Sequence, residues 1–177
     1  MTQRVDLATV MDRLAIDELI TGYALAVDDA DWPAYRRLFT ADGRLDCRDA
    51  GGIAGPVDEA AAWLTGTLRA FPVRQHLIVN RRVRLHEPDG YPADSAEARA
   101  DYVDAIPLDG FLSGGRYRFV LRRTPEGWRV HSVEAHERWR RAPGASEAAT
   151  APGRPEASGA PSAPGRGGAH EDASRVD

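Results

Sequence analysis

Three residues of this chain, Tyr23, Asp28 and His76, have the side-chain types of an acid–base site. Tyr23 and Asp28 are five positions apart near the end of an amphipathic segment, and His76 opens a strand-like run. Imidazole exchanges a proton near neutral pH, a carboxylate orients and charges it, and a phenol donates to developing negative charge. If the fold brings them together, they form an acid–base site that requires no metal or organic cofactor.

The composition excludes several other kinds of chemistry. The chain has 177 residues and no lysine, so its 23 basic residues are all arginine, which excludes Schiff-base catalysis and a P-loop lysine. The net charge of −4, without a basic patch that alternates with aromatics, argues against nucleic-acid binding. The single cysteine, Cys47, rules out an internal disulfide and indicates a reducing compartment. Because there is no apolar leader and no long apolar run, we expect a cytoplasmic protein without a membrane partner.

The composition changes near Ala142. Residues 142–177 consist mainly of Ala, Gly, Pro, Ser, Arg and Glu, and contain no aromatic residue. Such a segment buries too little apolar surface to offset the entropy of ordering it, so we expect a disordered tail. The sequence therefore predicts one folded domain over residues 1–141.

The elements that must position the three residues are helices followed by strands. Apolar periodicity predicts helices over 5–29, 32–39 and 56–70. Alternation predicts strands over 44–48, 74–86, 96–106, 116–123 and 128–140. The apolar residues of the first helix form two clusters on different sides, residues 7–14 and 16–27, so it either bends or is covered on two sides. This order predicts an α+β fold in which a long antiparallel sheet curls around the helices and leaves a pocket.

The same order resembles the cone-shaped α+β barrel of the nuclear-transport-factor and ketosteroid-isomerase fold. Within it, residues 23–43 (Tyr-Ala-Leu-Ala-Val-Asp-Asp-Ala-Asp-Trp at their start) and residues 75–80 (Gln-His-Leu-Ile-Val-Asn) are similar to the SnoaL-like branch. That branch includes scytalone dehydratase and the bile-acid 7α-dehydratases. The resemblance covers about residues 7–139 and implies a curved sheet around N-terminal helices, with an internal pocket.

The resemblance also assigns roles to particular positions. Tyr23, Asp28 and His76 match the tyrosine, aspartate and histidine of the bile-acid dehydratase pattern, which implies that they are catalytic. Asp101 matches a further pocket aspartate with a small shift in spacing. Cys47 stands where scytalone dehydratase has a pocket tyrosine, and other polar positions of that enzyme differ too, so scytalone is not the expected substrate.

Each assignment has a structural alternative. His76 is an ordinary strand residue if its face does not line the cavity, Asp28 is a solvated acid at a helix end, and Tyr23 is a core residue. Asn80 shares the face of His76 by alternation and is either a pocket group or a bulge residue. Asp101 is either a pocket residue or half of an ion pair on the strand surface.

Two classes of function follow from these residues. The first is a cofactor-independent acid–base enzyme, a dehydratase (lyase) or an isomerase or cyclase, acting on a cyclic apolar carbonyl compound of polyketide or steroid type. The second is a non-catalytic ligand-binding or accessory protein. A third interpretation, epoxide hydrolysis, requires Asn80, Arg99 and Asp101 to surround a water molecule.

The resemblance further implies a homodimer or homotrimer. We expect the outer face of the sheet, with Leu77, Val79 and either Tyr117 or Phe119, to be apolar enough to need a partner.

Overall fold

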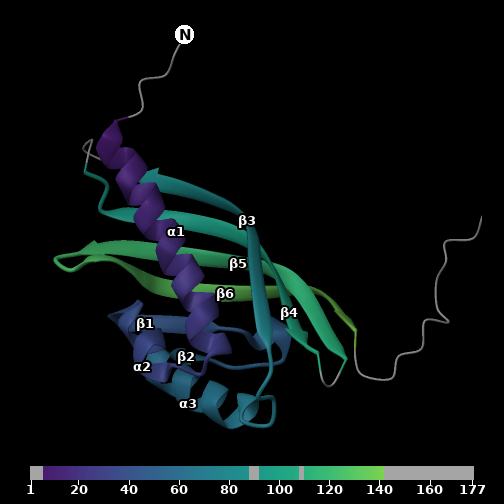
Figure 1. Ribbon diagram of the computed structural model, residues 1–177. Helices are drawn as coiled ribbons and strands as arrows, with labels where there is room; N and C mark the ends of the chain where they lie inside the picture. Colours follow the sequence, from purple (N-terminus) through teal and green to yellow (C-terminus); the bar gives the residue numbers. More distant parts are fainter. Residues whose placement is uncertain (1–5, 88–91, 108–109, 142–177) are drawn as a thin grey trace, which may run out of the picture. The chain divides into compact units, whose positions relative to one another are not determined.

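The computed structural model describes residues 6–87, 92–107 and 110–141, and the predicted tail lies outside them. The helices and two short strands come first in the chain, and four long strands follow, as Figure 1 shows. The helices are α1 (Leu7–Asp28), α2 (Trp32–Arg37), the 3-10 helix η1 (Arg48–Ala50) and α3 (Val57–Leu68). The strands are β1 (Phe39–Asp46), β2 (Ala54–Pro56), β3 (Gln75–His86), β4 (Ser95–Ile106), β5 (Phe111–Thr124) and β6 (Gly127–Arg141). The predicted α+β class is confirmed.

The six strands form one sheet in the order β2-β1-β6-β5-β4-β3. Neighbours from β3 to β6 pair antiparallel, as predicted, but β1 pairs parallel with β6 and antiparallel with β2. The sheet is therefore mostly antiparallel, as predicted, with one parallel pair that the sequence did not indicate. Parallel neighbours need a long connection, and here the whole of β2 to β5 separates the two strands, so turn signals in the sequence do not reveal the pairing.

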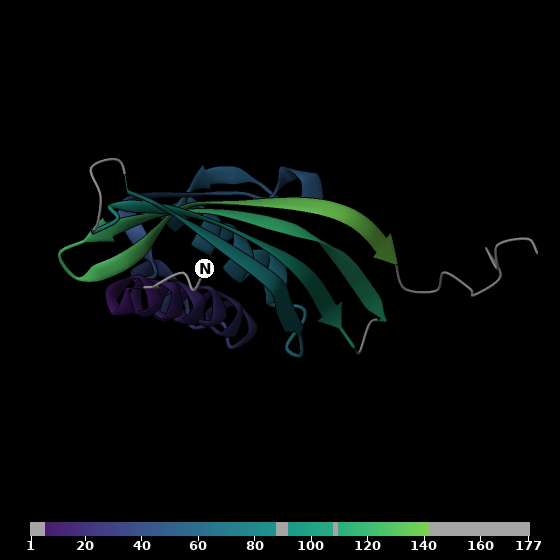
Figure 2. The same cartoon turned by 90° about the horizontal axis from the view of Figure 1, so that it is seen from above.

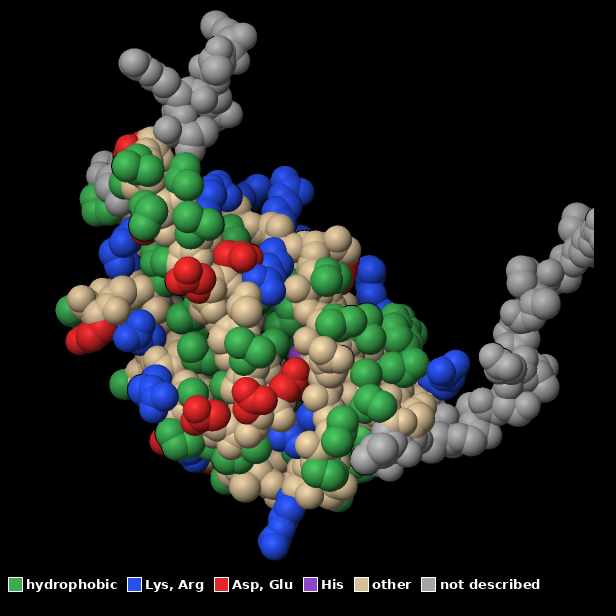
Figure 3. Space-filling model, in the orientation of Figure 1, with side chains coloured by type: hydrophobic (Ala, Val, Ile, Leu, Met, Phe, Trp, Pro, Cys, Tyr) green, Lys and Arg blue, Asp and Glu red, His purple; other side chains and the backbone are tan. Residues whose placement is uncertain are grey.

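Helix α1 covers the concave face of the sheet with only one of its two apolar clusters. Ile16, Ile20 and Val27 are buried, whereas Leu7 and Leu14 are more than half exposed. The helix is thus covered on one side, and Figure 3 shows the apolar side chains that remain exposed near its start. None of the described helices is both long and apolar enough to cross a membrane.

We call the face of the sheet that the helices cover the inner face, and the opposite face the outer face (Figure 2). Tyr117 and Phe119 are buried on the inner face, with exposed fractions of 6% and 0%. This corrects the expectation that either residue adds apolar surface outside. Leu77 and Val79 do lie on the outer face and are about half exposed, at 50% and 49%.

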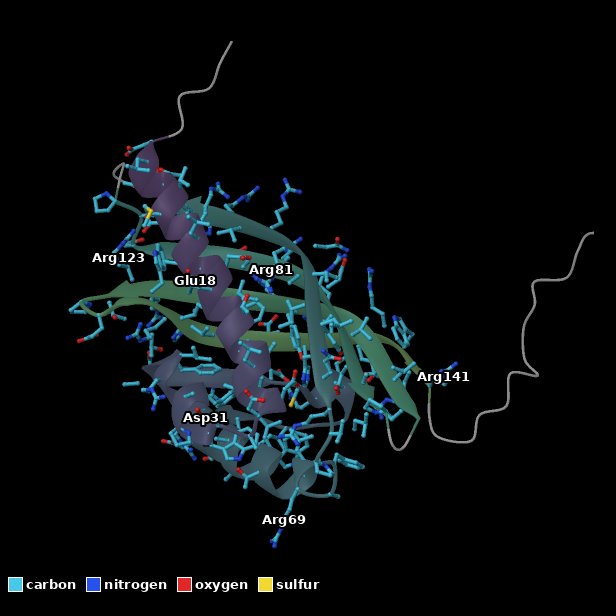
Figure 4. The ribbon with its side chains drawn as sticks, in the orientation of Figure 1. Glu18, Asp31, Arg69, Arg81, Arg123 and Arg141 are labelled. Atoms are coloured by element: carbon cyan, nitrogen blue, oxygen red, sulfur yellow. The ribbon has the colours of Figure 1, made fainter. Side chains whose placement is uncertain are left out.

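A β-bulge near the middle of β3 reverses its alternation. The pairing of β3 with β4 shifts register between Val79 and Arg82, and Asn80 has a left-handed φ of 52°. The extra residue turns Asn80 toward the outer face and Arg81 toward α1. The Arg81 guanidinium donates to the Asp17 carboxylate at 2.8 Å and so ties the strand to the helix, as the position of Arg81 in Figure 4 shows.

A second attachment joins the start of α1 to the hairpin of β5 and β6. The buried carboxylate of Asp12 accepts from Trp128 Nε1 at 3.0 Å and from the Arg123 guanidinium, which also lies 4.6 Å over the Trp128 ring. Removing one member of such a buried charged cluster leaves an uncompensated charge. Helix α1 is therefore fixed to the sheet near its start and at its middle, and this restricts where its C-terminus can lie.

Candidate active site

His76 and Asp28 meet where the C-terminus of α1 lies beside the start of β3. His76 Nδ1 is 2.6 Å from Asp28 Oδ1, and the backbone N–H of His76 donates to Asp28 Oδ2 at 2.9 Å. A carboxylate only accepts hydrogen bonds, so Nδ1 carries the proton in this pair and Nε2 keeps its lone pair when the ring is neutral. One carboxylate thus holds both the ring and the backbone of His76.

Arg74 holds the start of β3 beside the C-terminus of α1. Its Nε donates to the Val27 carbonyl at 2.9 Å, and its Nη1 donates to the Phe71 carbonyl at 2.7 Å. The last carbonyls of a helix have no partner within the helix, and a guanidinium satisfies them well. Arg74 therefore links the end of α1, the segment after α3 and the first residues of β3 around the His76–Asp28 pair.

The Nε2 side of His76 belongs to the wall of a cavity between the inner face and α3. The cavity has a volume of about 130 Å³. Its wall is mainly apolar and rich in aromatic rings, among them Tyr23, Trp63, Tyr102, Phe111 and Tyr117. Asp28 lies behind the imidazole rather than among the residues that line the cavity. The predicted convergence of imidazole and carboxylate is present, with the imidazole between the carboxylate and the cavity.

A second carboxylate, which the sequence interpretation missed, lies on the other side of the imidazole. Asp104 Oδ1 is 3.7 Å from His76 Nε2, too far for a direct hydrogen bond. Within the described residues this oxygen is buried and has no hydrogen-bond partner, and the same holds for the hydroxyl of Tyr102. Both residues line the cavity from β4 and lie two positions apart, so they share the inner face.

The two carboxylates and burial act in opposite directions on the imidazole. Burial lowers the pKa of His76, but the hydrogen bond that its Nδ1–H donates to Asp28 and the charges of Asp104 and Asp28 outweigh burial and raise that pKa above its ordinary value. Burial raises the pKa of Asp104 despite the nearby imidazole, which lowers it. The site therefore contains two proton carriers whose pKa values both move toward neutral pH, which is a common property of acid–base sites.

Tyr23 is both a core residue and a wall of the cavity. Its ring packs against the rings of Tyr35, Tyr117 and Phe119, each with centroids 5.7 Å apart. Burial raises the pKa of Tyr23 well above its ordinary value, and burial raises the pKa of Tyr102 to about 12. Both phenols are therefore protonated near neutral pH.

Asn80 and Asp101 lie outside this cavity, which corrects the prediction that they line it. Asn80 Nδ2 donates to Asp101 Oδ2 at 2.9 Å, and Arg116 Nε donates to Asp101 Oδ1 at 2.8 Å, all on the outer face. The bulge is the physical reason, because it ends the alternation that joined Asn80 to His76. Each residue takes the structural alternative named above: Asn80 is a bulge residue and Asp101 is half of a surface ion pair.

Two further residues of the wall have partners inside the protein. Cys47 Sγ donates to the Ile53 carbonyl at 3.3 Å, and burial raises the pKa of its thiol, so it behaves as a small apolar group. Arg140 at the rim is held by Glu137 at 2.8 Å and by the Ala50 carbonyl at 2.8 Å. Over the described ranges, no group of three or more His, Cys, Asp or Glu side chains is placed to hold a metal ion.

With this geometry established, comparison with known proteins identifies the family. Residues 8–134 match the SnoaL-like domain. The chain belongs to the SnoaL-like family. A relative in Mycobacterium tuberculosis, named as the uncharacterized protein Rv2910c, is 33% identical over 131 residues, which cover 71% of this chain and 85% of the relative.

Solved structures agree with the fold. An NTF2-like protein with a cystatin-like fold from Novosphingobium aromaticivorans superposes with a TM-score of 0.62 at 27% identity, covering 75% of this chain and 90% of that protein. A hexachlorocyclohexane dehydrochlorinase (LinA) superposes with a TM-score of 0.66 at 16% identity, covering 84% of this chain and 99% of that enzyme. At this identity the second similarity shows the shared fold alone.

Proposed function

We propose that this chain is a cofactor-independent acid–base enzyme, a dehydratase or an isomerase or cyclase, acting on a cyclic carbonyl compound that carries a hydroxyl group. One observation carries the proposal: His76 lines an aromatic-rich cavity and binds Asp28 through Nδ1, so Nε2 is the ring nitrogen left for a ligand. An imidazole oriented by a carboxylate on one nitrogen and open on the other is arranged to take a proton from a ligand.

The dehydration proceeds with one residue for both proton transfers. His76 Nε2 removes the proton next to the carbonyl, and the carbon–hydrogen electron pair forms an enolate. The enolate then expels the hydroxyl group on the adjacent carbon, which takes the same proton from His76 and leaves as water. The products are an unsaturated carbonyl compound and water, and His76 returns to its neutral form. Asp28 stabilises the imidazolium between the two steps.

The cavity supplies groups for the remaining charges. A phenol, Tyr23 or Tyr102, donates to the enolate oxygen, and a preorganised donor of this kind in a site that excludes water stabilises developing charge strongly. Asp104 accepts a hydrogen bond from the departing hydroxyl. Isomerisation and cyclisation share the first proton transfer, and they differ only in where the enolate reacts next.

The shared fold is compatible with an elimination. The dehydrochlorinase that shares this fold removes hydrogen chloride, as its name states. Loss of hydrogen chloride and loss of water both require a base for a carbon-bound proton and departure of a group from the neighbouring carbon. A site built from one base in an apolar cavity serves both reactions.

The decisive experiment replaces the imidazole. We expect His76→Ala to lower the turnover of cyclic β-hydroxyketones by about 10²–10⁴-fold, which is the usual contribution of general acid–base catalysis, while circular dichroism shows an unchanged fold. His136→Ala, which removes a histidine that is 56% exposed, is the matched control and keeps full activity. Unchanged turnover in His76→Ala contradicts the proposal, and binding without turnover in the wild type supports a ligand carrier instead.

A further inference from the structure

The size of the cavity limits what the site can enclose. An apolar cavity of roughly 150 Å³ holds one benzene molecule, and the cavity beside His76 has about 130 Å³. One six-membered ring therefore fills it, and the further rings of a fused polycyclic compound would project from its open side.

The side chains that line the cavity cannot easily move outward to enlarge it. Tyr102 and Tyr117 are stacked with ring centroids 4.3 Å apart. On the opposite side Trp63 packs against Gly52 so closely that a Cβ at Gly52 would lie 2.9 Å from the Trp63 ring and 2.3 Å from Cys47 Sγ. Packing of this density resists expansion, because each displaced ring must displace its neighbours.

Two polar atoms in this wall lack partners. The Tyr102 hydroxyl and Asp104 Oδ1 are buried and make no hydrogen bond to any described residue. Tyr102 as a whole is only 4% exposed. Buried polar groups in proteins almost always have a partner, and a small rotation of either side chain toward the cavity would let a ligand supply one. A carboxylate accepts from a hydroxyl group, and a phenol donates to a carbonyl oxygen.

The charges around the cavity disfavour an anionic ligand. Asp104 and Glu137 both belong to the wall, and Asp28 lies directly behind His76. The one arginine among the lining residues, Arg140, is already bound by Glu137 and by a backbone carbonyl. A carboxylate or phosphate on a ligand would therefore lose its hydration and meet negative charge, without a free arginine in this part of the wall.

From these observations we infer that the site selects a neutral compound with a single six-membered ring, bearing a hydroxyl that donates to Asp104 and a carbonyl that accepts from Tyr102. This inference rests on the proposed function for the site, and it narrows the substrate class to compounds with a single ring, which are preferred over tricyclic and tetracyclic compounds of polyketide or steroid type. Imidazole Nε2 then lies beside the ring carbon between the two oxygen-bearing carbons.

Binding of unreactive probes tests the inference separately from catalysis. Meta-hydroxybenzaldehyde is neutral, has one ring and carries both oxygen groups, but cannot lose water. Meta-hydroxybenzoate adds a negative charge, and estrone carries hydroxyl and carbonyl groups on four fused rings. By calorimetry, wild-type protein binds meta-hydroxybenzaldehyde at least about tenfold more tightly than either of the others. Equal or tighter binding of estrone or of the benzoate overturns the inference.

Variants locate the contacts. Tyr102→Phe and Asp104→Asn each weaken binding of meta-hydroxybenzaldehyde by about threefold to tenfold, as expected for the loss of one hydrogen bond. Asp101→Asn, on the outer face of the same strand, is the matched control and changes nothing. If both inner-face variants bind as well as the wild type, the assigned contacts are wrong.

Enlarging the cavity gives a test by gain of binding. Trp63→Ala removes a half-buried wall residue, and we expect it to bind estrone more tightly than the wild type does, while Trp32→Ala, which removes a half-buried tryptophan outside the cavity, does not. The two proposals fail in different ways. Selective binding of the single-ring probe without turnover of any cyclic hydroxyketone refutes the enzyme but keeps the ligand class. Turnover of a fused-ring compound with no selectivity refutes the ligand class but keeps the enzyme.

Discussion

The inner and outer faces of β4 place the same residue type in opposite electrostatic environments. Asp101 and Asp104 are three positions apart, so they point to opposite faces. On the outer face, hydrogen bonds from Asn80 and Arg116 lower the pKa of Asp101. On the inner face, burial raises the pKa of Asp104, and its Oδ1 has no hydrogen-bond partner among the described residues.

The difference shows that the direction of a side chain from the strand, more than its chemical type, decides its role. The outer face carries charged residues in exposed pairs, such as Arg118 with Glu97 at 3.4 Å. Such pairs contribute little to stability because water screens them. The inner face carries small and aromatic residues, and the few polar atoms among them are available to a ligand.

The largest expected effect is the loss of turnover in a variant of Asp28, which holds the inner-face residue His76. In Asp28→Asn, turnover falls by about 10²-fold or more, because the imidazole loses its orienting carboxylate. The proposed base is the neutral imidazole, so the rate rises with pH through the pKa of His76. Since the hydrogen bond and charge of Asp28 raise that pKa, the rise moves to lower pH in the variant.

A pH–rate profile of Asp28→Asn measures both changes. Asp29→Asn, which alters the exposed neighbouring acid, keeps the wild-type profile. A profile for Asp28→Asn that rises at the same pH as the wild type would show that the pair does not control the catalytic proton.

The next largest contrast between the two faces is expected in the free energy of unfolding. Phe119 is fully buried on the inner face, and Phe119→Ala lowers the free energy of unfolding by about 3–5 kcal/mol, as is typical for a core phenylalanine. Arg118, the neighbouring residue on the outer face, is 43% exposed, and Arg118→Ala costs less than about 1 kcal/mol. Urea denaturation compares the two variants, and equal losses would contradict the assignment of the faces.

A smaller effect concerns assembly. The homodimer or homotrimer stays a prediction, and its test is Leu77→Asp, which places a charge among the apolar residues of the outer face. Leu77 pairs across the sheet with Val103, Val103 with Gly114, and Gly114 with Trp139, so these positions form one row. Sedimentation velocity is expected to show a smaller species for Leu77→Asp, whereas an unchanged sedimentation coefficient excludes this row as the contact.

The smallest effect is expected at Asp101. Asp101→Asn breaks an exposed pair on the outer face and leaves kcat/KM at the wild-type value, although Asp101 lies only three residues from Asp104. A loss of kcat/KM comparable to that of Asp104→Asn would show that the two faces are coupled, and the comparison between them would no longer hold.

Local patterns in the sequence predicted most of the fold. Helical periodicity located α1 and α3, and alternation located β3 to β6, because burial of one face imposes those periods. The parallel pairing of β1 with β6 was not predictable, since no turn joins them. Asn80 was placed on the wrong face because alternation assumes an unbroken strand, and no local pattern announced the bulge.

Alternation along β4 also indicates which of its carboxylates faces the site. Along β4 the small residues Ala96, Ala98 and Ala100 recur at every second position and predict an inner face. The next two positions of this series are Tyr102 and Asp104, so the series includes Asp104 and not Asp101. The family resemblance pointed to Asp101 instead, because it fixed the type of the residue and left its exact position open. The pairing of His76 with Asp28 depended on the resemblance, since the two lie 48 residues apart.

The double contact between Asp28 and His76 has a spectroscopic consequence. Because the backbone N–H of His76 donates to the carboxylate that also binds Nδ1, the amide proton resonance of one residue responds to the charge of the pair. Its chemical shift follows the titration of the site without a label or a substrate. Its rate of exchange with deuterium reports how often the end of the helix separates from the strand.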